Sequence, residues 1–138
     1  MKTIALVALL LLLPLNASAI EWRTANQVTV AWDAVTTLED GTTIPAGSTV
    51  QYQVFIRVDP GGTPVAGATT NATQAVITLA TEGRFHVGIK AQRLVSGQVV
   101  SESLIAWSSN VASAAGGNTW GVVYYLPLAP AKNLRTIP

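Results

Sequence analysis

The amino-acid sequence predicts an all-β domain in which two sheets face each other. The main observation is a strict alternation from Leu79 to Ala91, where apolar or small residues occupy every second position. Successive side chains of a strand point to opposite faces, so this set lies on one side of an extended chain. The set crosses a corner at residues 81–83, as happens where a chain passes between two sheets. Turn formers recur about every eight to twelve residues, which is typical of a β-sandwich.

Residues 1–19 have the features of a secretory signal peptide. Lys2 provides the positive start, residues 4–13 form the apolar run, and Ala17-Ser18-Ala19 provides the small residues of a cleavage site. We expect cleavage between Ala19 and Ile20. The apolar run is shorter than the roughly 20 residues that a membrane-spanning helix needs. The predicted product is an exported protein, periplasmic, cell-surface or extracellular, with no membrane span after cleavage.

The composition of the remaining chain narrows its class. About 119 residues suit one domain with a real core. The chain has eight Lys and Arg and seven Asp and Glu, and loss of Lys2 with the signal peptide makes these numbers equal. The sequence has no cluster of basic residues, so it does not indicate a nucleic-acid partner. There is no cysteine, which fits a bacterial exported protein that depends on its core rather than on disulfides.

The strands can be placed in order. Residues 27–33 alternate with Val28, Val30 and Trp32 inward, and a loop rich in turn formers follows. Residues 49–58 form the next strand, in which Phe55 lies out of phase with the inward set. Four further strands are predicted, the first of them an edge strand and the last a broken one. They cover residues 65–70, 74–79, 85–94 and 99–111.

The residues after Val111 have a different character. Residues 113–118 are small and glycine-rich, which predicts a flexible linker. Residues 119–126 are rich in Val and Tyr and predict another strand. The chain then continues with an apolar and basic segment over residues 128–135. We expect three parts in all: a signal peptide over 1–19, a β-sandwich over 20–112, and a linker with a strand-like extension over 113–138.

Trp32, Tyr52, the alternation from Leu79 to Ala91 and the closing segment 102–111 together resemble a fibronectin type III domain of the bacterial exported type. The resemblance covers residues 27 to about 111. It implies an immunoglobulin-like sandwich of two sheets, with Trp32 and Tyr52 on facing sheets in a common core. The family usually has Tyr where this chain has Phe85, so the hydroxyl hydrogen bond of its tyrosine corner is absent here.

The two ends of the chain also bear on this resemblance. Residues 128–135 resemble the opening strand of a fibronectin type III domain. The segment between Ile20 and Trp32 is short for such a strand. We therefore expect a sheet with an unpaired edge, which favours addition of a strand from elsewhere. Residues 119–135 would either fold back onto their own sandwich or insert into a neighbouring copy.

The residue inventory argues against an enzyme. His86 is the only histidine, and its alternation with Phe85 and Val87 predicts a solvated imidazole that faces away from the core. One histidine without cysteine does not provide a zinc site. Glu39 and Asp40 are more simply explained by a turn than by half of a calcium site. We expect no catalytic residue, metal or cofactor.

Aromatic residues are the candidate partner contacts. They are Trp22, Phe55, Trp120, Tyr124 and Tyr125. The alternative role for them is closure of the core or an extra edge strand. The sequence thus favours a non-enzymatic exported structural or protein-interaction module that associates with itself or another protein. The alternative is a carbohydrate-binding accessory module in which Trp120, Tyr124 and Tyr125 stack on sugars.

Overall fold

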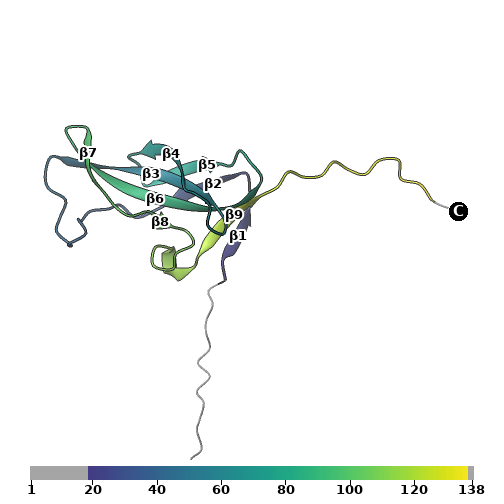
Figure 1. Ribbon diagram of the computed structural model, residues 1–138, viewed down its shortest axis with the longest axis horizontal. Coiled ribbons are helices and arrows are strands. Elements are labelled where there is room, and N and C mark those ends of the chain that lie inside the picture. Colours follow the sequence, from purple (N-terminus) through teal and green to yellow (C-terminus); the bar gives the residue numbers. More distant parts are fainter. Residues whose placement is uncertain (1–18, 137–138) are drawn as a thin grey trace, which may run out of the picture.

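The protein is a sandwich of two β-sheets, which confirms the all-β prediction (Figure 1). The computed structural model describes residues 19–136, so the predicted signal peptide lies outside the described residues except for Ala19. The small sheet pairs β2 (Gln27–Ala31) with β5 (Gln74–Thr78) in antiparallel fashion. The large sheet contains the other strands, in the order β1-β9-β6-β3-β4.

Two long strands form the centre of the large sheet. β3 (Ser48–Val58) and β6 (Gly83–Val95) are antiparallel and stay in register from Ser48 opposite Val95 to Val58 opposite Phe85. β4 (Val65–Thr70) pairs with the outer edge of β3, as an edge strand should. The alternation seen in the sequence therefore gives these two strands one inward and one outward face.

Three short strands follow one another along the second edge of β6. They are β7 (Gln98–Glu102), β8 (Ala106–Trp107) and β9 (Trp120–Tyr124). The sequence predicts a broken strand as far as Val111, but the ladder of β8 stops at Trp107, and the Asn110 N–H then donates to the Trp107 carbonyl at 3.0 Å in a turn.

Serine side chains take over hydrogen bonds where this edge is interrupted. The Oγ of Ser103 accepts the N–H of Ala91 at 2.9 Å, between β7 and β8. The Oγ of Ser108 accepts the N–H of Val87 at 3.1 Å, after β8. Because these side chains satisfy backbone donors of β6, the sheet tolerates the breaks.

The residues predicted as a linker form an ordered loop. The N–H groups of Ser113 and Ala114 donate to the Asn110 carbonyl at 3.0 and 2.9 Å. A short 3₁₀ helix, η1 (Ala115–Gly117), follows, with positive φ at both of its glycines. Glycine-rich composition here provides left-handed turn positions. The large sheet continues beyond residue 112, where the sequence placed the domain boundary.

The strand predicted over residues 119–126 joins its own domain as β9. It pairs antiparallel with the start of β6, and β1 (Glu21–Thr24) lies parallel to it on the outer side. Val122 at the centre of β9 is fully buried. The segment after Val111 is therefore part of the core up to Tyr124, and the N-terminal segment does contain a strand, although only a short one.

The core lies between the inward faces of the two sheets. It contains two clusters of buried apolar side chains. One joins both sheets, and the other lies at the corner formed by residues 79–85. Tyr52 of β3 is 3% exposed and contacts Trp32 edge to face, with ring centroids 5.3 Å apart. Phe85 is buried without a hydroxyl, and the Tyr52 hydroxyl instead accepts the N–H of Val35 at 2.9 Å.

The bond between Tyr52 and Val35 should contribute measurably to stability. We expect Tyr52→Phe to lower the free energy of unfolding by about 0.5–1.5 kcal/mol, because the ring packing persists while one hydrogen bond is lost. Tyr125→Phe is the matched control, since Tyr125 is 58% exposed and should leave the urea midpoint unchanged. Equal midpoints for both variants would show that solvent replaces the hydroxyl at no cost.

Candidate functional site

The outer edge of β2 is unpaired within residues 19–136. On its inner edge, the Trp32 N–H donates to the Thr73 carbonyl at 2.9 Å, and the Leu79 N–H donates to the Asn26 carbonyl at 2.8 Å. In an antiparallel pair the hydrogen-bonded positions alternate, so every second residue of β2 directs its backbone groups away from β5. These outward residues are Gln27, Thr29 and Ala31.

A groove of about 600 Å³ runs beside this free edge, between β2 on one side and β8 with the η1 loop on the other. The residues that line it are apolar or small, apart from Asp33. Core residues in contact with it are Val30, Val87 and Ile89; aromatic ones are Trp32, Trp107 and Trp120; small ones are Ala31, Ala106, Ser108, Ser113, Ala114 and Ala115. The groove exists because the small sheet is too narrow to cover the large one.

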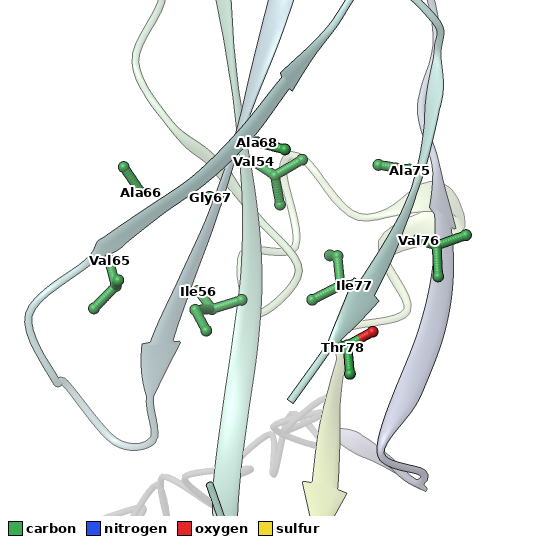
Figure 2. Close-up of a pocket in the computed structure, with 10 residues that line it drawn as sticks. All are labelled: Val54, Ile56, Val65, Ala66, Gly67, Ala68, Ala75, Val76, Ile77 and Thr78. Atoms are coloured by element: carbon green, nitrogen blue, oxygen red, sulfur yellow. The ribbon is translucent and has the colours of Figure 1, made fainter. Parts of the chain in front are cut away.

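A second, smaller groove of about 210 Å³ lies on the opposite side of the small sheet, between β4 and β5. Figure 2 shows Val54, Ile56 and Ile77 directed into the space between the two sheets. The backbone of β4 closes one side of it. This groove therefore has about a third of the volume of the one beside β2.

The chain beyond β9 leaves the sandwich as an extended segment (Figure 1). We call residues 126–136 the C-terminal tail. Its first N–H, of Leu126, donates to a side-chain oxygen of Glu82. Its leucines are among the most exposed large apolar side chains described: Leu126 is 62%, Leu128 95% and Leu134 92% exposed. Exposed leucines spaced along an extended segment are typical of a chain that binds elsewhere.

The aromatic residues proposed for sugar stacking do not form one platform. Trp120 packs against both core clusters and Tyr124 against one of them, because alternation in β9 turns both toward the core. Tyr125 alone of the three is exposed. The structure thus assigns Trp120 and Tyr124 the core-closing role that the sequence left open.

His86 corrects one expectation, because its side chain is buried at 2% exposure. It does lie on the outer face of β6, opposite in phase to Phe85 and Val87. However, β1 places Trp22 over this face, with ring centroids 5.3 Å from His86. Trp22 reaches it across Gly121, where a Cβ would come within 2.5 Å of the indole. The phase of a strand tells which face a residue is on, but not whether a distant segment covers that face.

The ring nitrogens of His86 both have partners. Nε2 lies 2.8 Å from Oδ1 of Asp59, and Nδ1 lies 3.3 Å from the Trp120 carbonyl. A histidine held in this way has no free nitrogen for a substrate. Within residues 19–136 no three His, Cys, Asp or Glu side chains gather as a metal site.

Cations and aromatic rings cover the rest of this outer face. The Arg84 guanidinium lies 4.8 Å from the Trp22 ring, and that of Arg57 lies 4.1 Å from the Trp107 ring. Phe55, out of phase in its strand, is half-buried below Lys90, whose Nζ lies 5.5 Å from its ring. Such stacks shield apolar rings with side chains of the same domain.

Two carboxylates have perturbed ionisation, and neither of them lines the groove. Hydrogen bonds from the Gln92 and Lys90 side chains lower the pKa of Glu102. Hydrogen bonds from the side chain and backbone of Thr42 lower the pKa of Asp40. Asp40 thus acts as a turn residue, as the sequence predicts, and neither group is placed for chemistry in the groove.

Comparison with known proteins gives no relative: no family model, curated protein or solved structure matches this chain. Over residues 19–136 no helix has the length and hydrophobicity to span a bilayer.

The contact between His86 and Asp59 should be structural. We expect a double-mutant cycle of His86→Ala and Asp59→Ala to give a coupling free energy of about 0.5–3 kcal/mol, because the pair is in contact and largely desolvated. The control cycle pairs Arg23 with Glu21, whose exposed side chains are 3.6 Å apart and should show no measurable coupling. Chemical denaturation of the seven proteins, the wild type and three variants for each cycle, decides it; equal coupling in both cycles would contradict a structural role.

Proposed function

We propose that this chain is an exported, non-enzymatic module of the fibronectin type III kind that works by protein–protein association and assembles with itself through its C-terminal tail. One observation carries the proposal. The same molecule has an unpaired strand edge above an apolar groove and an extended segment with exposed leucines. Each feature provides what the other lacks, since an extended segment gains both hydrogen bonds and burial when it adds to a sheet edge.

The side-chain chemistry supports an association function over catalysis. The histidine is buried and both of its nitrogens are engaged, so it is poorly placed as a general base. The groove is lined by apolar and small side chains with a single carboxylate, Asp33. Such a surface suits an apolar peptide segment rather than a reacting polar substrate.

The carbohydrate alternative receives less support. Sugar stacking needs flat aromatic faces that are open to solvent together. Trp120 and Tyr124 contribute to the core, and Trp22 and Phe55 are covered by cationic side chains. Tyr125 would have to bind sugar alone.

The proposal predicts that self-association depends on the tail. We expect the exported protein that begins at Ile20 to run as oligomers in size-exclusion chromatography with light scattering. A chain that ends at Leu126 keeps β9 and its bond to Glu82, so it should be a folded monomer. A monomeric full-length chain at high micromolar concentration would contradict the proposed function.

The truncation point matters for this test. A chain that ends at Val111 also loses β9, and with it Val122, which is fully buried in the core. We expect that shorter chain to unfold, so loss of oligomers in it would carry no information about the tail.

A further inference from the structure

We propose that residues 128–135 of one copy add as an antiparallel strand to the outer edge of β2 in a second copy, and so cover the groove beside it. This inference rests on the proposed function and specifies its partner, its acceptor and its direction. The donor is described in the structure and is exposed, and the acceptor edge is unpaired within residues 19–136.

The donor and the acceptor match in length and chemistry. The donor has eight residues at positions 128–135, and the free edge of β2 with the two residues after it has seven, at positions 27–33. Leu128, Pro130, Lys132 and Leu134 have the same parity, so an extended donor directs all four to one face. Its two leucines would lie on the apolar residues that line the groove, and the long side chain of Lys132 would extend its ammonium group to solvent. Pro130 is compatible with an added strand, since proline is tolerated at a sheet edge.

The direction follows from how the groove is closed. At the Gln27 end the chain crosses from the large sheet to the small one: the Ala25 N–H bonds to the Val123 carbonyl, and the next residue, Asn26, bonds to Leu79. The residues of β2 and the following loop that line the groove run from Val30 to Asp33, so we take this crossing to close the groove at the Gln27 end. A donor therefore enters from the Asp33 end and runs toward Gln27, which is antiparallel to β2.

The same geometry favours a second copy over the donor's own chain. β9 ends beside Gly83, so the tail leaves the domain at the blocked end (Figure 1). To enter its own groove from the open end, the tail would first have to run alongside β6 from Gly83 to Ile89. These six residues of β6 span about 20 Å. This path would take up about half of the tail, and too few residues would remain to turn and pair with β2. The tail of a neighbouring copy can reach the open end without this path.

The end of the donor would lie close to the start of the acceptor. The N–H of Glu21 donates to the Thr119 carbonyl at 2.9 Å, and the next residue, Trp120, lines the groove. Ile20 therefore lies beside the groove wall. A donor that runs toward Gln27 finishes near this point, so the tail of one copy leads toward the first strand of the next. Donor and acceptor are different surfaces, so the contact is heterologous and propagates from copy to copy.

The acceptor is tested with two matched proline variants of one cross-strand pair. Thr29 and Val76 are opposite each other in the small sheet, and each directs its backbone N–H away from the partner strand. Thr29→Pro removes a donor from the proposed acceptor edge, and Val76→Pro removes one from the edge beside the smaller groove. We expect Thr29→Pro to abolish the oligomers and Val76→Pro to retain them, both with circular dichroism of a folded domain.

Mixing separates this inference from the proposed function. Thr29→Pro keeps its tail, and the chain that ends at Leu126 keeps its β2 edge, so the two should form a 1:1 heterodimer although each alone is monomeric. Oligomers that depend on the tail but survive Thr29→Pro, or that disappear with Val76→Pro, would overturn the β2 acceptor while leaving the proposed function standing. Absence of oligomers in the unmodified protein would overturn both.

A rearranged chain covers the case in which Thr29→Pro does not fold. Residues 127–138 are moved from the C-terminus to a position directly before Ile20, so that each molecule carries its own donor in the proposed direction. We expect a monomer with a higher melting temperature than the chain that ends at Leu126. An unchanged melting temperature, or continued oligomerisation, would overturn the inference.

Discussion

The structure depends on the burial of β6 on both of its faces. Phe85 and Val87 on the inner face and His86 on the outer face are all buried, and both edges of the strand are paired. A surface strand of an antiparallel sheet usually needs cover on one face only. Here the outer face obtains its cover from Trp22 and Trp107, which reach it across Gly121 and Gly88, respectively. β1, β8 and β9, which pair with one another or with β6, thus bring in the residues that keep the outer face of β6 buried.

The inner half of the fold could be predicted from sequence because alternation is a local signal. The inward positions of Val30, Tyr52 and Ile77 follow from a period of two, and all three are buried. The outer cover of His86 could not be predicted in the same way. It depends on the parallel pairing of β1 with β9, two segments almost a whole chain apart. The one available signal was a glycine opposite each tryptophan, at Gly121 and Gly88.

Composition was misleading in the segment after Val111. Glycine and small residues predict a flexible linker, but the same residues provide the positive φ angles of Gly116 and Gly117 in an ordered turn. The only sequence feature related to the groove is the short segment before Trp32, which predicts an unpaired sheet edge but not a groove beside it. Neither its volume nor its aromatic lining follows from any local pattern, because β2, β8 and η1 meet there from distant parts of the sequence.

Tryptophan side chains in the lining of the groove allow its occupancy to be measured by the protein's intrinsic fluorescence. Two of the four tryptophans, Trp32 and Trp120, line it and pack against the inner core, whereas the rings of Trp107 and Trp22 cover the outer face of the large sheet. Indole emission shifts to shorter wavelength when water is removed from the ring, so a segment that occupies the groove shifts the emission of Trp32 and Trp120 and leaves that of Trp22 and Trp107 unchanged. Occupancy can thus be followed during assembly without an added label, in a chain whose lack of cysteine would otherwise require one to be introduced.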